Sequence, residues 1–331
     1  MSNYTSNDII NAIAAAAKAL EARKDEINRL NVFPVPDGDT GTNMSLTLAM
    51  VVENLAKLPI GASSEDRRRA ITTGALMGAR GNSGVITSQI MRGLCEGIAD
   101  HEEFSIVAVD DAFSRAVEVA FNAVRKPVEG TILTVLRDTA TAAHKARKKK
   151  MELDEGLQFI VGESYASVQR TPELLPVLKE NGVVDAGGFG IAIFFDSFVA
   201  SLTGRAEAMV DELAFARTAA PKVEIEQIND WEGSKYKYCN EFLVNSETLD
   251  PEEALDFLQT MGDCELCVGS TPKFKVHVHS NTPDKVLAYF LERGEIFEVF
   301  IHNMKLQSEE RTEKLEAEQE AAHKAIGFVA V

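Results

Sequence analysis

The sequence predicts a multi-domain protein in which an all-α, eight-helix up-and-down barrel or bundle is followed by an α/β domain. Three observations lead to this prediction. Apolar residues recur at helical spacing through about 200 residues, strand-like alternation begins only near residue 235, and a length of 331 residues allows about two domains. We therefore expect a helical domain over residues 1–205, a linker over 206–233 and an α/β domain over 234–324.

The eight expected helices are bounded by turn and capping residues. They cover about 7–29, 42–57, Ser63 to Met77, the GARGNSG segment to Ile98, a stretch ending near Val124, a stretch opened by PVEGT, 154–168 and 187–202. A short capped turn is expected at Thr171–Glu173. Because the connections are short, consecutive helices should be antiparallel neighbours.

Loops after the odd-numbered helices should meet at one end of such a bundle. These loops are DGDTGTN (37–43), GARGNSG (78–84), PVEGT (127–131) and GVVDAGG (182–188), and they hold glycines and small polar residues. Each one opens a helix, and helix N-termini bind phosphate well. Glycines also end helices without any ligand, but that explanation does not account for their enrichment in alternate loops. We therefore favour a triphosphate pocket.

The first of these loops contains two carboxylates, Asp37 and Asp39, separated by one glycine. Their charges repel unless a cation lies between them. Hard oxygen ligands of this kind suit Mg²⁺, which leaves its other positions to water and phosphate. The simpler interpretation of this loop by itself is a surface turn with a helix cap.

The composition excludes several function classes. There are 34 Lys and Arg against 51 Asp and Glu, a net charge of −17, so nucleic acid or an anionic membrane is not the expected partner. The four cysteines do not suggest a disulfide scaffold. The polar first ten residues do not resemble a signal peptide, and no run of 18 apolar residues is present. We expect a cytoplasmic protein with no transmembrane segment.

Strand and helix signals alternate after residue 234. Strands are expected at 235–245, 265–269, 273–280 and 295–303, and helices at 251–261 and 283–293. The order βαββαβ is the ferredoxin-like pattern, in which helices cover one face of the sheet. Phe274, Val276 and Val278 should point to the covered face, and Lys275, His277 and His279 to the open face.

The open face offers a candidate metal site. Cys239 on the first strand should neighbour His277 and His279, and two imidazoles with a thiolate suit Zn²⁺. The alternative is a solvated or dimer-forming face with incidental histidines. Cys264 and Cys267 should face opposite sides of their strand, which makes them a poor chelating pair.

Four segments together resemble a known family. NVFPVPDGDTGTNM, GARGNSGV, KPVEGTILTV and GVVDAGG occur in that order and resemble the ATP-binding L subunit of dihydroxyacetone kinase. They are more similar still to the kinase (A) subunit of bacterial fatty acid kinase, over about residues 5–205. The resemblance implies a helical barrel with ATP or ADP and two Mg²⁺ at one end.

The resemblance also implies roles for individual residues. Asp37 and Asp39 match the metal ligands, and the nucleotide contacts match Thr40, Gly41, Thr42, Asn43, Asn82, Ser83, Gly84, Gly130, Thr131, Asp185, Ala186 and Gly187. The dihydroxyacetone branch has a third acidic ligand where this chain has Val32, next to Asn31. A three-carboxylate site is therefore not expected.

The segments YCNEF and KVHVHSN resemble the linker domain of the fatty acid kinases, where the matching Cys and two His bind metal. The resemblance implies ATP-dependent phosphorylation of a fatty acid, presented by a DegV-type binding protein, to an acyl phosphate for phospholipid synthesis. Arg80 is a candidate to steady the transferred phosphate. The alternatives are a dihydroxyacetone-type kinase of small alcohols and a nucleotide-sensing dimeric scaffold without turnover.

We expect a homodimer formed through the middle domain. We also expect a last helix over about 306–324, and residues 325–331 (AIGFVAV) begin a strand-like segment. A further domain follows this position in the resembling family, so we expect the chain to be a shortened form that lacks it.

Overall fold

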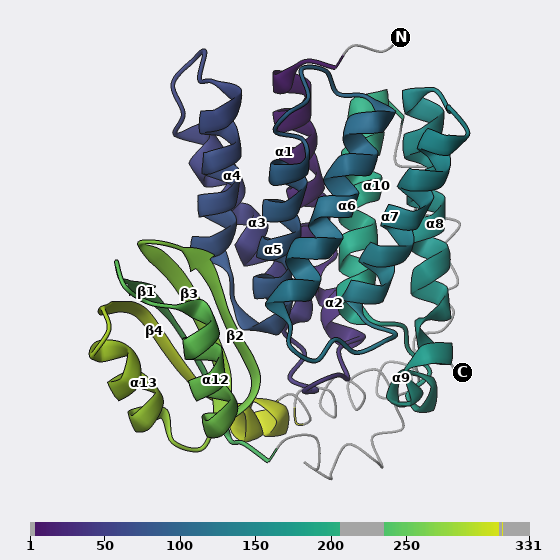
Figure 1. The fold of residues 1–331 in the computed structure, drawn as a ribbon. Coiled ribbons are helices and arrows are strands. Elements are labelled where there is room, and N and C mark those ends of the chain that lie inside the picture. The colour runs from purple at the N-terminus through teal and green to yellow at the C-terminus, as the bar shows by residue number, and fades with distance from the viewer. Residues whose placement is uncertain (1–3, 206–234, 311–312, 314–331) are drawn as a thin grey trace, which may run out of the picture.

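The computed structural model describes residues 4–205, 235–310 and 313 (Figure 1). The helical domain consists of α1 (Ser6–Ala22), α2 (Lys24–Arg29), α3 (Thr40–Ala56), α4 (Ser64–Gly78), α5 (Gly81–Gly97), α6 (Ile106–Ala123), α7 (Ile132–Lys148), α8 (Leu153–Leu174), α9 (Pro176–Glu180) and α10 (Ala186–Thr203). The long helices run up and down beside one another. The predicted all-α fold is thus confirmed.

Two predicted boundaries are wrong. The first expected helix breaks at Arg23, whose ψ of 10° lies outside the helical range, and α2 begins after it. The expected turn at Thr171–Glu173 lies inside α8. Pro172 has no N–H for the carbonyl of Val168, four residues earlier, but the Thr171 hydroxyl donates a hydrogen bond to that carbonyl at 2.7 Å. The helix therefore continues past the proline.

Helix α10 is the central core helix of the bundle, packed against α1, α7 and α8. Within the described residues it is the one helix long and apolar enough to cross a membrane, with 18 residues and a mean hydropathy of 1.5. However, 78% of it is buried inside the protein. Its apolar surface is accounted for by the bundle core, where Phe194 and Phe195 stack edge to face.

The second domain follows the predicted βαββαβ order. Its elements are β1 (Tyr238–Asn245), α12 (Pro251–Met261), β2 (Gly262–Ser270), β3 (Lys273–Ser280), α13 (Pro283–Leu291) and β4 (Glu295–Asn303). The strands lie in the antiparallel order β2-β3-β1-β4, which is the ferredoxin-like arrangement. The register places Cys239 opposite His279 and Glu241 opposite His277.

The sheet face expected to be open is covered. Lys275, His277 and His279 do point away from α12 and α13, but their exposed fractions are only 0%, 1% and 3%. The sheet packs against the ends of α4 and α5, and Ala79 and Val85 share an apolar cluster with β2 (Figure 1). The alternation of residues along a strand predicts which side chains share a face of the sheet, but it does not predict what packs against that face. The helical domain of the same chain takes the place of solvent or a dimer partner.

The predictions for the linker, for most of the last helix and for the terminal segment cannot be compared with the structure. The linker 206–233 and segment 325–331 lie outside the described residues, as does most of the expected helix 306–324.

Candidate functional site

A cavity of about 650 Å³ lies between the helix ends and the sheet. All four loops singled out in the sequence contribute to it, through residues that include Asp37, Asp39, Asn82, Thr131 and Asp185. The sheet contributes Cys239, Glu241, Asp263, Cys264, His277 and His279 to the same cavity. The two candidate sites identified separately in the sequence therefore face each other across one space.

Two asparagines shape the first loop. Asn31 accepts hydrogen bonds from the N–H groups of Asp39 and Thr40 at 3.1 and 3.3 Å. Asn28 accepts hydrogen bonds from the N–H groups of Gly41 and Thr42 at 2.8 and 3.2 Å. These bonds occupy N–H groups that the sequence pattern assigned to phosphate. The nucleotide contacts expected at this helix start stay a prediction.

Gly41 also has a packing role. A Cβ atom on Gly41 would lie 2.3 Å from the carbonyl oxygen of Lys24, so α2 and α3 approach each other too closely for any other residue. Sequence reasoning did not single out Asn28. It lies 13 residues before Gly41, so no local pattern connects it with the loop.

Asp37 and Asp39 both line the cavity, and their carboxyl groups are hydrogen-bonded to each other. Burial raises the pKa of Asp39, and hydrogen bonds to Asn43 and Asp37 act in the opposite direction. Two adjacent carboxylates in a confined space are stabilised by a cation. Their hard oxygen donors fit Mg²⁺.

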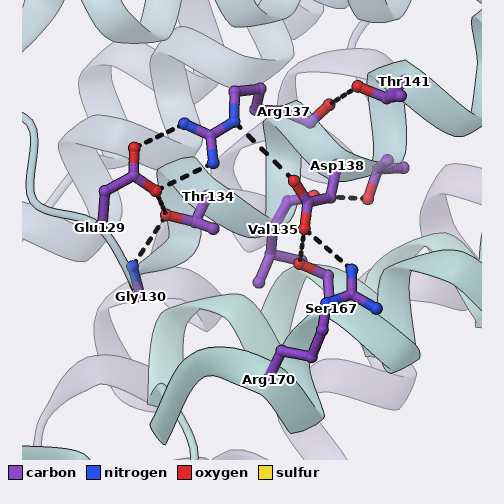
Figure 2. A network of polar contacts seen from close by, with 10 residues as sticks. Glu129, Gly130, Thr134, Val135, Arg137, Asp138, Thr141, Ser167 and Arg170 are labelled. Atoms are coloured by element: carbon purple, nitrogen blue, oxygen red, sulfur yellow. Dashed lines mark hydrogen bonds and ion pairs between the residues drawn. The ribbon is translucent and has the colours of Figure 1, made fainter. Parts of the chain in front are cut away.

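The third loop, PVEGT (127–131), is held in place by a network of ion pairs and hydrogen bonds (Figure 2). Arg137 donates to both oxygens of Glu129 at 2.6 and 2.9 Å, and the Thr134 hydroxyl donates to Glu129 at 2.9 Å. The N–H of Gly130, whose φ is +83°, donates to the Thr134 oxygen at 2.9 Å. Asp138, next to Arg137, links the network to α8 by accepting a hydrogen bond from Ser167. The PVEGT loop is therefore anchored to α7 through a side chain, Arg137, that its own sequence does not contain.

Asp185 lies within the fourth loop, GVVDAGG, and caps α10. Its carboxylate accepts a hydrogen bond from the N–H of Gly188 at 2.7 Å. Burial raises the pKa of Asp185 to about 7, and hydrogen bonds from backbone N–H groups only partly oppose this. The carboxyl group is thus set to change its charge near neutral pH.

Arg80 lies at the junction of the two domains. Its guanidinium stacks on Phe300, 4.4 Å from the ring centroid, and lies 3.7 Å from a carboxylate oxygen of Glu298. It also donates to the carbonyl of Ala79 at 2.8 Å. These contacts give Arg80 an interdomain role, and its role toward a transferred phosphate stays a prediction.

The sheet side of the cavity holds the Cys/His cluster. The ligand atoms of Cys239, His277 and His279 lie within 4.8 Å of one another, and Sγ of Cys239 is 3.7 Å from Nδ1 of His277. Nε2 of His277 is buried and has no hydrogen-bond partner among the described residues. Burial raises the pKa of the Cys239 thiol. A Zn²⁺ ion would bind the thiolate form and the imidazoles, so the donor set fits that metal.

Glu241 joins this cluster to the helical domain. Its carboxylate lies 3.1 Å from Nδ1 of His277 and 3.9 Å from Nζ of Lys275, and it accepts a hydrogen bond from the N–H of Gly81. Burial opposes ionisation, but His277 and Lys275 outweigh it and lower the pKa of Glu241 to about 2. Sequence reasoning missed Glu241, although its position two residues after Cys239 places it on the same strand face.

The two domains match two different protein families. The family described as DAK2 domain matches residues 34–200, and the family described as the middle domain of fatty acid kinase A-like proteins matches residues 235–311. An uncharacterized protein of Staphylococcus haemolyticus is 38% identical over 313 residues, which cover 92% of this chain and 56% of that protein. An uncharacterized protein of Staphylococcus aureus is 38% identical over 306 residues, which cover 90% of this chain and 55% of that protein.

The chain spans about half the length of these relatives. Among solved structures, the dihydroxyacetone kinase from C. freundii in complex with AMP-PNP and Mg²⁺ aligns with a TM-score of 0.46 and 17% identity, covering 60% of this chain and 34% of that one. The DAK2 match extends over half of the chain, and the second match begins where the sheet domain does. The chain therefore belongs to the DAK2-domain family, and its second domain is similar to the middle domain of fatty acid kinase A-like proteins.

Proposed function

We propose that this chain is the nucleotide-binding part of a fatty acid kinase. The observation that carries the proposal is the single cavity in which Asp37 and Asp39 lie beside the starts of α5, α7 and α10. The DAK2 match supports a kinase, and the description of the middle-domain family supports a fatty acid as acceptor. The reaction would convert ATP and a fatty acid carboxylate into an acyl phosphate and ADP.

Different residues of the cavity would bind the metal ion and the phosphate groups. Asp37 and Asp39 would hold Mg²⁺, which neutralises charge on the phosphates when bound. The helix starts at Asn82, Thr131 and Asp185 would surround the phosphate chain. Catalysis by such a site consists of positioning and charge stabilisation.

The acceptor requires no general base. A fatty acid carboxylate is already ionised at neutral pH, so one of its oxygens attacks the γ-phosphorus directly. The new P–O bond forms as the bond from γ-phosphorus to the β,γ-bridging oxygen breaks, and ADP leaves with that oxygen. A DegV-type protein would present the fatty acid, and Arg80 would contact the transferred group. This chain matches about half of the length of its relative from Staphylococcus haemolyticus, so both assignments are proposals for this chain.

The first test is nucleotide binding by calorimetry, with and without Mg²⁺. We expect Mg²⁺ to strengthen ADP and ATP binding to the wild type, and Asp39→Ala to lose that dependence. Asp100→Ala, an exposed aspartate in a loop at the other end of the bundle, is the matched control and should bind like the wild type. No nucleotide binding by the wild type would refute the proposal.

A second measurement separates kinase from scaffold. ATP consumption should rise when an acyl-loaded DegV-type protein is added to a chain that already binds Mg-nucleotide. Nucleotide binding without such stimulation would favour a nucleotide-sensing scaffold. Stimulation by a small alcohol instead would favour a dihydroxyacetone-type acceptor.

A further inference from the structure

An irregularity in β2 brings two potential ligands to the cavity beside His279. The pairing of β2 with β3 shifts between Asp263 and Leu266, and Cys264 has a φ of +54°. A regular strand would send consecutive side chains to opposite faces. In this structure Asp263 and Cys264 both line the cavity. Bulges that redirect side chains in this way are common next to functional sites.

Both redirected side chains lie close to the imidazole of His279. The ligand atoms of Asp263, Cys264 and His279 lie within 4.8 Å of one another. Nδ1 of His279 and Oδ1 of Asp263 face each other at 3.4 Å, and neither atom makes a well-formed hydrogen bond to any described residue. The His279 side chain is only 4% exposed. Buried polar atoms usually have a partner, and a shared metal ion would supply one.

We propose that Asp263, Cys264 and His279 form a second metal position, next to the Cys239, His277 and His279 position. A carboxylate, a thiolate and an imidazole are a ligand set that suits Zn²⁺. Across the described residues, no group of mutually close ligand atoms contains both Cys239 and Cys264. The structure thus favours two neighbouring positions that share His279 over one site with two thiolates.

This second position lies beside one of the nucleotide loops. Cys264 and Asn82, in the loop that starts α5, line the same cavity, and the Asn82 side chain is close enough to act on the pKa of the Cys264 thiol. Asn82 is one of the residues matched to nucleotide contacts, so a metal ion at Cys264 would lie beside the candidate phosphate site. Metal binding at this position does not depend on kinase activity.

The test counts metal ions and thiolate ligands. The chain is stripped with a chelator and reloaded with Zn²⁺ for elemental analysis, and separately with Co²⁺, whose thiolate charge-transfer absorption reports each bound sulfur. We expect about two equivalents of Zn²⁺, and the loss of about half of the Co²⁺ charge-transfer intensity in either Cys264→Ser or Cys239→Ser. Cys267→Ser, whose side chain lies in the helix-covered core, is the matched control and should bind like the wild type.

Three outcomes would overturn the inference. Full zinc content and full charge-transfer intensity in Cys264→Ser would show that this thiol binds no metal. One equivalent in the wild type, with intensity lost only in Cys239→Ser, would leave only the first position. One equivalent whose intensity falls in both variants would mean a single ion bound by both sulfurs. If Cys264→Ser does not fold, Asp263→Asn should still lose one equivalent of zinc.

Discussion

At the scale of single residues, Asp185 provides a stability prediction with a defined sign. Its carboxyl pKa is raised to about 7 in the folded protein, against an ordinary value of 3.8. Between these two pH values the folded state keeps a proton that the unfolded state loses. The free energy of unfolding therefore falls as pH rises from about 4 to about 7, and stays low above that.

Asp185→Asn should remove this penalty while keeping the helix cap, because asparagine caps as well as aspartate. We expect the variant to be more stable than the wild type at pH 8, by roughly 1 to 4 kcal/mol. The gain should disappear near pH 4. Thermal unfolding of both proteins at pH 4, 6 and 8 checks this, and a gain that is equal at all three values would contradict it.

Residue-level prediction succeeded where the chemistry was local. Asp37 and Asp39 stand out because two carboxylates share one short loop, and both lie in the cavity. Asn28 was missed because its partners lie 13 and 14 residues away. An asparagine that caps a helix from another element leaves no mark in the sequence around that helix.

At the scale of elements, close packing of α5 on α6 depends on Gly93. A Cβ atom at this position would lie 2.4 Å from Cα of Ala116. Gly93→Ala should therefore destabilise the protein by about 1 to 3 kcal/mol, although alanine is the better helix former. Denaturant unfolding measures the change.

Gly162 in α8 is the matched control for Gly93. Of the described residues, none places an atom within 4 Å of a Cβ built at Gly162. Gly162→Ala should therefore stabilise the protein by about 0.5 to 1 kcal/mol. Equal effects of the two substitutions would show that helix propensity, and not the contact between α5 and α6, determines the result.

The PVEGT loop depends on α7 through Arg137. Arg137→Met removes both hydrogen bonds from Arg137 to Glu129 and leaves the hydrogen bonds of Thr134 to hold the loop that contains Gly130. We expect nucleotide affinity to fall several-fold, with little change in helix content, because the site loses preorganisation. Arg170→Met, which removes only the hydrogen bond to Asp138, is the control. Calorimetry and circular dichroism separate the two effects, and unchanged affinity in Arg137→Met would contradict the prediction.

Periodicity predicted the elements well because most of them bury one face. It failed at Pro172, where a threonine hydroxyl compensates for the missing backbone donor. The prediction that Cys264 and Cys267 face opposite sides of their strand is confirmed, since Cys264 lines the cavity and Cys267 lies in the helix-covered core. Alternation did not reveal the bulge that brings Asp263 to the same cavity, because a bulge is an irregularity of the backbone.

At the scale of the whole molecule, Glu241 is the clearest connection between the domains. It contacts His277 of the Cys/His cluster and the N–H of Gly81 at the start of α5. Glu241→Gln should weaken zinc binding and also loosen the start of α5, since a neutral amide is a poorer acceptor for both partners. We expect hydrogen exchange at residues 81–84 to become faster and zinc affinity to fall several-fold.

Glu298→Gln is the control for Glu241→Gln. Glu298 also bridges the domains, through Arg80, but its side chain is 50% exposed, so its ion pair should contribute little. An unchanged exchange rate at residues 81–84 in Glu241→Gln would show that the two domains meet there without influencing each other.

The order of the two domains follows from the sequence, whereas their arrangement does not. Both halves of the cavity were identified from local patterns, but no local pattern indicates that His277 and Asp39 belong to one site. His277 and Asp39 share one cavity because the helical domain covers the polar face of the sheet. The alternation of side chains in the sequence shows that this face is polar, but it does not show that the face is buried.

The covered sheet face has a consequence for the lifetime of the proposed product. An acyl phosphate is a mixed anhydride, which water cleaves without benefit to the cell. In a cavity bounded by helix ends on one side and by a sheet on the other, a reacting phosphate is shielded from bulk solvent on these two sides. The sheet domain would thus reduce hydrolytic loss of the activated acyl group before its release.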